Sequence, residues 1–291
     1  MTRIRWEKWR QIASVALLLG SPLSARAADK VPARPEVRSA AALIVDANTG
    51  DVIFERDAKL VTPVASITKL MTALVVLDGK QPLDEVIKIT AADRWKGKGA
   101  FSHLPNGAKL TRGDLLRLAL MASENLAART LGRNYPGGLT AFVRTMNMKA
   151  KVLGMTQTHF DDPSGLSSLN VSTARDLVKL VNAASRNPQI KEYSTLATHE
   201  VRAGKSVRLY RNTNLLVGKP DWDIVVQKTG FTNDAGQCLV MEAMIAERPV
   251  VMVFLNSFGK LTRTADARRI RKWMEARQEM GAAGGSGLAK K

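Results

Sequence analysis

The sequence predicts an α+β fold in which strands from both ends of the chain form one antiparallel sheet, and the helices between them cover it. Two β-prone runs within residues 39–56 are separated by Asn48-Thr49-Gly50, a hairpin signal. Helical periodicity fills most of residues 111–187. Strand-like segments return from about residue 197 onward. This order of elements places the first hairpin beside the last strands.

The first 27 residues have the three parts of a secretory signal peptide. Four basic residues are followed by an apolar run from Ile12 to Leu19 and by Ala25-Arg26-Ala27, a small-x-small cleavage site. The apolar run is too short to span a bilayer, and a retained amphipathic anchor is the alternative. We expect residues 28–38 to be a leader, residues 39–278 the folded domain and residues 279–291 a flexible tail.

The chain is strongly basic. Its formal net charge of +18 becomes +14 when residues 1–27, which hold five basic residues and one acidic residue, are removed. In an exported protein this charge favours an anionic partner such as a cell-wall polymer or a membrane surface, with solubility alone as the alternative. No zinc-finger or RNP-type motif favours nucleic acid.

Cysteine and histidine are too few for a disulfide or a recognisable zinc site. Cys238 is the only cysteine and lies in an apolar run, which predicts a buried, inert thiol. The three histidines, His103, His159 and His199, lack metal-ligand spacing, so we expect no metal and no cofactor. No G-x-S-x-G elbow is present to hold the serine of a catalytic triad.

The stretch "PVASITKLMTALVVLD" contains a Ser-x-x-Lys motif at the start of an apolar helix. The i, i+3 spacing places Ser66 and Lys69 on one helix face, within reach of a hydrogen bond. Burial and the helix dipole both favour the neutral amine, which would make Lys69 a general base beside a nucleophile. A capping serine with a lysine that reaches solvent explains the motif alone equally well. Ser257 and Lys260 repeat the spacing at a strand end.

A second motif, Ser123-Glu124-Asn125, interrupts a long helical pattern with three polar residues. Serine and asparagine compete for backbone hydrogen bonds inside helices, so we expect a break here. Ser123 offers a hydroxyl that can pass a proton, and Asn125 an amide that can orient a substrate or a lysine. A helix junction with Ser123 as N-cap is the alternative, and Ser168-Leu169-Asn170 repeats the Ser-x-Asn spacing.

The third motif, Lys228-Thr229-Gly230, ends the apolar strand "DIVVQ". A cation, a hydroxyl and a glycine on a strand suit recognition of a carboxylate, with Gly230 leaving room for a substrate backbone. The next backbone amide, at Phe231, can face a developing oxyanion. A charged strand end followed by a turn is the alternative for this motif alone.

In this order, Ser-x-x-Lys, Ser-x-Asn and Lys-Thr-Gly resemble the motif set of penicillin-binding proteins and class A β-lactamases. The segments "YPGG", "LGMTQTHFDDPSGLS" and "KTGFTNDAGQCL" are similar to low-molecular-mass penicillin-binding proteins that act as D-alanyl-D-alanine carboxypeptidases and endopeptidases. The resemblance covers about residues 38–275 and looks closest to the endopeptidase branch. It implies a β-lactamase/transpeptidase-like fold, with residues 39–278 as the D,D-peptidase catalytic domain.

The resemblance also implies three catalytic residues. Ser66 would attack the D-alanyl carbonyl and form an acyl-enzyme, and Lys69 would take the proton of its hydroxyl. Ser123 would relay a proton to the leaving amine.

Further residues would bind the substrate. Asn125 would hold Lys69 and the substrate amide, and the Lys228-Thr229-Gly230 motif would bind the anionic part of the substrate. The backbone amides of Ser66 and Phe231 would form the oxyanion hole, in which one donor is typically worth about 3 kcal/mol in the transition state.

Two departures refine the expected function. A class A β-lactamase needs a glutamate downstream of the middle motif, but the corresponding loop reads "HFDDPSGLSSLN", so we expect β-lactams to inhibit rather than to be hydrolysed. Asp161 and Asp162 leave this open, with an Asp-Pro-Ser-Gly turn as the better interpretation. In place of a C-terminal β domain, residues 262–280 predict a helix packed on the sheet, basic enough for peripheral membrane attraction at most.

The sequence therefore predicts a periplasmic serine D,D-endopeptidase that hydrolyses D-alanyl cross-links in peptidoglycan and is inhibited by β-lactams. A D-alanyl-D-alanine carboxypeptidase is the main alternative. A β-lactamase and a non-catalytic cell-wall-binding module are the remaining hypotheses.

Overall fold

The structure is a computed structural model that describes residues 33–97, 102–203 and 206–285. The expected signal peptide and the first part of the expected leader lie outside these ranges. Residues 33–38, the remainder of the leader, form neither helix nor strand.

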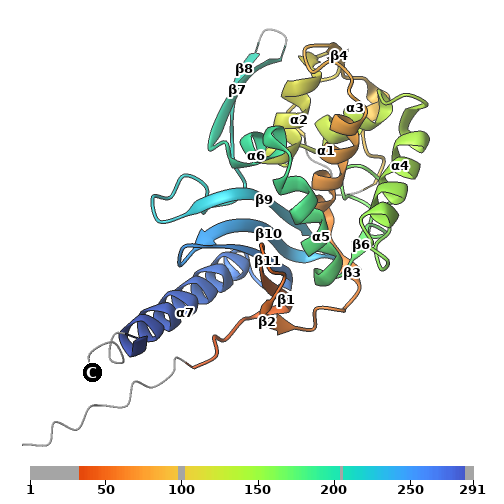
Figure 1. Ribbon diagram of the computed structural model, residues 1–291. Coiled ribbons are helices and arrows are strands. Elements are labelled where there is room, and N and C mark those ends of the chain that lie inside the picture. Colours follow the sequence, from red (N-terminus) through yellow and green to blue (C-terminus); the bar gives the residue numbers. More distant parts are fainter. Residues whose placement is uncertain (1–32, 98–101, 204–205, 286–291) are drawn as a thin grey trace, which may run out of the picture. The chain divides into compact units, whose positions relative to one another are not determined.

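A five-stranded antiparallel sheet with the order β2-β1-β11-β10-β9 forms the core of the described chain (Figure 1). Its strands are β1 (Ser39–Asp46), β2 (Val52–Arg56), β9 (Asp223–Thr232), β10 (Gly236–Ile245) and β11 (Arg248–Ser257). Strand β1 pairs with β11, so that Ser39 lies opposite Ser257. The prediction of one sheet shared by the first hairpin and the last strands is confirmed.

Both faces of this sheet are buried along β1, β10 and β11, which explains why these three strands are apolar at most positions. Successive side chains of a strand point to opposite faces. Leu43 and its equivalents join a core formed with the helices of the middle of the chain. Ile44 and its equivalents pack against Ile270 and Trp273 of the C-terminal helix α7 (Thr262–Gly285). The sheet thus separates a helical region from α7 (Figure 1).

The helical region lies on one face of the sheet, as predicted. Its helices are α1 (Thr68–Asp78), α2 (Arg112–Met121), α3 (Asn125–Arg133), α4 (Gly138–Val152), α5 (Ala174–Ser185) and α6 (Pro188–Thr195), with the 3-10 turns η1 (Ala65–Ile67) and η2 (Ala91–Asp93). Short ladders join β3 (Thr62–Pro63) to β6 (Val171–Ser172) and β4 (Val86–Lys88) to β5 (Lys109–Thr111). Residues 68–76 of α1 are all buried, as its apolar sequence predicted.

Two segments differ from the sequence-based expectation. The first strands after residue 197, β7 (Thr198–Ala203) and β8 (Ser206–Arg211), form a separate hairpin and do not join the main sheet. Helix α7 continues to Gly285, past residue 279 where the flexible tail was expected to begin, and residues 286–291 lie outside the described part. None of the described helices is long and apolar enough to cross a membrane.

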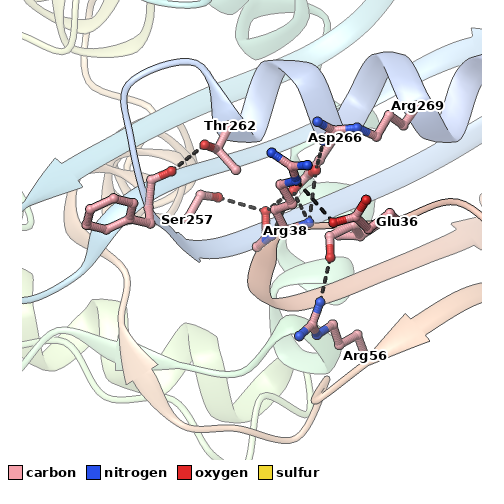
Figure 2. A network of polar contacts seen from close by, with 10 residues as sticks. Glu36, Arg38, Arg56, Ser257, Thr262, Asp266 and Arg269 are labelled. Atoms are coloured by element: carbon pink, nitrogen blue, oxygen red, sulfur yellow. Dashed lines mark hydrogen bonds and ion pairs between the residues drawn. The ribbon is translucent and has the colours of Figure 1, made fainter.

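Asp266 on α7 binds the start of β1 and so joins segments far apart in the sequence (Figure 2). Its buried carboxylate accepts hydrogen bonds from the backbone amides of Arg38, at 3.0 and 3.1 Å, and of Ser39, at 2.8 Å. It also accepts from the Ser39 hydroxyl at 2.6 Å and pairs with Arg269 at 2.5 Å. Because Ser39 Oγ lies 2.7 Å from Ser257 Oγ, the network reaches the end of β11.

We expect Asp266→Asn to lower the free energy of unfolding by about 2–4 kcal/mol. In the variant, the side-chain amide at this position would place an N–H group opposite the backbone N–H groups of Arg38 and Ser39. In wild type, these backbone groups donate to the buried Asp266 carboxylate. Urea denaturation of both proteins at one pH measures the difference.

Asp221→Asn is the matched control. Asp221 is exposed, and its ion pairs with Arg268 and Arg271 are 4.0 and 3.4 Å long. Exposed pairs contribute at most about 1 kcal/mol. Equal losses in the two variants would contradict the role given to Asp266.

Candidate active site

Ser66 lies in the tight turn η1, which runs directly into helix α1. The preceding residue, Ala65, has a φ of +47°, a left-handed conformation that is unfavourable for a residue with a side chain. Ile67 occupies the N-cap position of α1, and no side chain forms a cap bond there. The alternative in which Ser66 caps the helix is therefore wrong.

The Lys69 side chain is fully buried and reaches oxygen atoms of three separate segments. Its Nζ lies 2.7 Å from Ser66 Oγ, 2.8 Å from Asn125 Oδ1 and 2.7 Å from the backbone oxygen of Ser164. Only the serine hydroxyl among these can also donate. A neutral amine has two N–H donors and one lone pair, so it can donate to Asn125 and Ser164 while it accepts the Ser66 proton. This is the geometry of a general base beside a nucleophile.

Burial is the largest influence on Lys69 and lowers its pKa from 10.5 to about 7. The nearby carboxylates of Asp162 and Glu124 oppose this shift because they favour the protonated amine. Lys69 also lies in the first turn of α1, where the helix dipole disfavours a cation. The amine is thus substantially neutral near neutral pH, and the alternative of a lysine that reaches solvent is wrong.

The helix break predicted at Ser123-Glu124-Asn125 lies between α2 and α3. Ser123 has a φ of +57°. Glu124 is the N-cap of α3, and its carboxylate accepts from the Ala127 amide at 2.9 Å, so Ser123 is not the cap. The Ser123 hydroxyl forms no hydrogen bond with the part of the chain that the structure describes. Asn125, in contrast, is brought directly to Lys69.

The Lys-Thr-Gly motif lies on β9, an edge strand of the sheet that packs against η1. Lys228 is fully buried, and its Nζ donates to the backbone oxygen of Thr229 at 2.9 Å. Burial above all holds the pKa of Lys228 well below its usual range, and the nearby Arg263 and any protonated Lys69 act in the same direction. Thr229 Oγ1 lies 2.6 Å from Thr213 Oγ1. The motif is thus adjacent to the Ser66 turn.

The space left by the missing side chain of Gly230 is occupied by the backbone of the turn that carries Ser66. A Cβ at this position would lie 2.8 Å from the backbone oxygen of Val64 and 3.3 Å from Ser66 N. The glycine lets β9 approach the turn that carries Ser66, whereas its place in the motif suggested that the space would serve a substrate backbone. Phe231, whose amide is expected in the oxyanion hole, follows on the same strand with an exposed side chain.

No residue type in the sequence marks the contribution of residues 161–170, because the contact with Lys69 is made by a backbone oxygen. The buried Asp162 carboxylate accepts from the amides of Ser164, Gly165 and Ser167 at 2.6, 3.1 and 2.9 Å, and from the Ser164 hydroxyl. These bonds form the expected Asp-Pro-Ser-Gly turn and hold the Ser164 carbonyl toward Lys69. Asp161 is exposed.

Two more residues fasten this loop to the nucleophile turn. Asn170 is buried, and its Nδ2 donates to Thr68 Oγ1 at 2.9 Å and to the Asp162 backbone oxygen at 2.8 Å. Gly165 has a φ of +81°, and a Cβ there would lie 2.0 Å from the Ala65 oxygen. The sequence signalled a turn at this glycine, but not its contact with η1.

Other singled-out residues lie apart from this site. Ser257 is buried against Ser39, and Lys260 is exposed beyond the end of β11. Cys238 is buried, as predicted, and burial raises the pKa of its thiol to about 11. In the described ranges no group of three His, Cys, Asp or Glu side chains is placed to hold a metal ion.

Comparison with known proteins identifies the family. The sequence profile described as D-alanyl-D-alanine carboxypeptidase matches residues 28–259. The chain therefore belongs to the D-alanyl-D-alanine carboxypeptidase family, which confirms the resemblance carried by the three motifs.

Similar proteins include D-alanyl-D-alanine endopeptidases. The chain is 49% identical over 250 residues to that of Pseudomonas aeruginosa, covering 85% of this chain and 81% of the relative. It is 48% identical over 276 residues to that of Escherichia coli, covering 92% and 88%.

Solved structures confirm the predicted transpeptidase-like α+β fold. A Streptomyces DD-transpeptidase matches with a TM-score of 0.77 and 27% identity, over 82% of this chain and 98% of the other. A penicillin-binding protein of Listeria monocytogenes in a cefotaxime-bound form matches with a TM-score of 0.73 and 29% identity, over 84% and 98%.

We expect acylation of Ser66 by a labelled penicillin to slow about tenfold per pH unit below pH 7 and to level off above it. Protonated Lys69 cannot accept the serine proton. Lys69→Met should lose acylation at every pH, as measured by covalent labelling.

The pH dependence of the free energy of unfolding tests the lowered pKa of the same lysine. The unfolded chain keeps the Lys69 proton up to pH 10.5, whereas the native site releases it near 7, so unfolding takes up a proton in this window. Wild type should therefore gain stability over Lys69→Met as the pH rises through it, by about 1.4 kcal/mol per pH unit. Urea denaturation measures this, with the exposed Lys191→Met as control. A pH-independent difference would contradict the lowered pKa.

Gly165→Ala and Gly50→Ala form a matched pair. Both glycines have a positive φ, +81° and +78°, but an added Cβ meets Ala65 only at Gly165 and meets nothing within 4 Å at Gly50. Gly50→Ala should cost about 1 kcal/mol of stability and acylate normally. Gly165→Ala should acylate about a hundredfold more slowly, because the loop must move away from Lys69. Similar labelling rates would show that this contact does not position the site.

Proposed function

We propose that this chain is a serine D,D-endopeptidase that hydrolyses D-alanyl cross-links in peptidoglycan through an acyl-enzyme. The observation that carries the proposal is the 2.7 Å contact between Lys69 Nζ and Ser66 Oγ, which pairs a buried amine of lowered pKa with a hydroxyl. The names of relatives at 49% and 48% identity support the cross-link as substrate. The family's description favours the alternative, a carboxypeptidase that removes terminal D-alanine.

In acylation, Ser66 Oγ bonds to the D-alanyl carbonyl carbon while its proton passes to Lys69. The backbone amides of Ser66 and Phe231 stabilise the oxyanion, and each such donor is worth about 3 kcal/mol. The close approach of β9 to η1 at Gly230 supports this assignment. As the carbon–nitrogen bond breaks, the proton held by Lys69 passes through the Ser123 hydroxyl to the leaving nitrogen.

In deacylation, a water oxygen bonds to the ester carbon while Lys69 takes one water proton. The bond between this carbon and Ser66 Oγ then breaks, the proton returns from Lys69 to Ser66 Oγ, and the peptide leaves with a free D-alanyl carboxyl group. Asp162 is occupied by its own turn and Glu124 by the cap of α3. Neither carboxylate is therefore free to accelerate this step for a bulky β-lactam. β-Lactams act accordingly as slowly released covalent inhibitors.

Lys228 and Thr229 recognise the carboxylate that lies beside the scissile bond, and Asn125 holds the substrate amide together with Lys69. Burial lowers the pKa of Lys228. An arriving carboxylate favours its protonated form. We assign no role in the reaction to the thiol or the histidine side chains and propose no cofactor for it.

The enzyme is placed in the periplasm, where residues 1–27 would direct it and residues 39–278 would form its catalytic domain. The signal-like N-terminus and the basic composition support this placement. The positive charge also favours contact with anionic wall polymer. Its partners are peptidoglycan and β-lactams, without nucleic acid.

Incubation with cross-linked muropeptide dimers tests the function. Wild type should release monomers without free D-alanine, and a labelled penicillin should bind covalently. Ser66→Ala should lower turnover at least about a thousandfold and lose the label, because the nucleophile is absent. Mass spectrometry identifies the products.

Ser168→Ala removes an exposed serine of a neighbouring loop and should retain both activities. Free D-alanine with intact cross-links would identify a carboxypeptidase. Repeated turnover of a chromogenic cephalosporin would identify a β-lactamase. Wall binding that persists in Ser66→Ala, without turnover in wild type, would identify a non-catalytic module.

A further inference from the structure

A groove leads away from the active site, past the loop at residues 212–219 and the start of α7. Two adjoining hollows of about 810 and 660 Å³ form it and share the lining residues Asn214, Leu215, Leu261 and Thr264. The first hollow begins at Thr229 and Phe231, and the second ends at Arg211, Lys219 and Arg268. The groove is therefore continuous with the Lys-Thr-Gly motif.

The groove is basic along its whole length. Its lining residues include Lys260 and Arg263 near the active site and Arg211, Lys219 and Arg268 at the far end, and none of them is an aspartate or glutamate. Within the described residues, only Arg268 of these five is paired with a carboxylate, that of Asp221 at 4.0 Å. Such a surface favours a ligand that carries several carboxylates.

Apolar side chains alternate with these cations. The exposed fractions along the first hollow are 94% for Phe258, 61% for Leu261, 58% for Leu215 and 56% for Phe231. A ligand with aliphatic segments between its charged groups would cover them.

Asn214 lines both hollows and is itself buried. Its Oδ1 accepts from the Leu216 amide at 3.1 Å, but its Nδ2 has no hydrogen-bond partner in the described chain. A buried donor without a partner is costly. An acceptor on a bound ligand, such as a peptide carbonyl, would satisfy this donor.

The position of the cations indicates which side of the scissile bond faces the groove. In a D-alanyl cross-link to diaminopimelate, the carbon attached to the leaving nitrogen carries a carboxylate, whereas the acyl side has none next to the bond. Arg263 lines the groove where it meets Thr229, and its charge contributes to lowering the pKa of the neighbouring Lys228. Cations at this end match the leaving side.

We propose that this groove is the subsite for the leaving peptide strand, an inference that rests on the proposed endopeptidase function. The carboxylates of that strand lie against Arg211, Lys219 and Arg268, and its aliphatic segments against Leu215 and Leu261. A single leaving D-alanine would end near Thr229. The groove therefore favours cleavage of cross-links over removal of terminal D-alanine.

Leu261→Glu tests the groove at an exposed position. A carboxylate there should repel the leaving strand and lower kcat/KM for a muropeptide dimer at least about tenfold, mainly through KM. Hydrolysis of a monomeric pentapeptide that ends in D-Ala-D-Ala, and acylation by penicillin, should each stay within about twofold. The matched control is Val152→Glu, at an apolar position of α4 that is 80% exposed, and it should change none of these three rates.

The cationic end is tested by removing a positive charge from the groove and, separately, the negative charges from the leaving strand. Arg268→Ala should lower kcat/KM for the dimer about fivefold. Amidation of the carboxylates on the leaving strand should slow wild type to a similar degree and leave Arg268→Ala unaffected. Independent effects of amidation and substitution would overturn the assignment of the leaving strand to this end.

Parallel losses on dimer, monomer and penicillin in Leu261→Glu would overturn the proposal, because a subsite for the acyl strand would affect all three. An unchanged dimer reaction would also overturn it. Failure of the endopeptidase function is distinguishable, since wild type would then cleave monomers or acylate with penicillin but leave dimers intact.

Discussion

The burial of the Lys69 amine is the constraint on which the rest of the site depends. Three segments supply its partners: η1 with Ser66, the α2–α3 junction with Asn125, and the loop at residues 161–170 with the Ser164 carbonyl. Each segment has its own local structure: η1 begins at the left-handed Ala65, the α2–α3 junction contains the Glu124 cap, and the loop at residues 161–170 is held by the Asp162 turn. The basicity of the lysine is therefore a property of the tertiary structure and cannot be ascribed to one residue.

Most of the fold could be predicted because burial leaves a strong pattern in the sequence. An apolar run such as "VVMVFL" indicates a strand covered on both faces, and the apolar α1 indicates a helix without a solvent face. The structure supplies the two covers, the helical region and α7. The location of β7 and β8 could not be predicted. Their alternating apolar and polar residues indicate a half-exposed hairpin, but not whether that hairpin joins the main sheet. The short ladders such as β3 with β6 are too brief to leave a signal.

The site could be predicted where side chains perform the chemistry, but not where the backbone does. Ser66, Lys69 and Asn125 stand out by spacing and order, and the structure brings them together. The Ser164 carbonyl is a group that every residue has, so no residue type marks it. Ala65 and Ser123 adopt positive φ without being glycine, so turn statistics do not flag them. Gly230 is conspicuous in the sequence as part of the third motif. A glycine is required there, however, because the backbone of the nucleophile turn lies too close for a side chain.

The pairing of β1 with β11 has a consequence for the order in which the protein can fold. Asp266 binds the Arg38 amide across a separation of 228 residues. Synthesis from the N-terminus provides β1 and α1 long before β9, β10, β11 and α7. Contacts of such long range are slow to form. We therefore expect a nascent or partly translocated chain to carry its serine and lysine without a site around them, so that the topology itself delays activity until synthesis is complete.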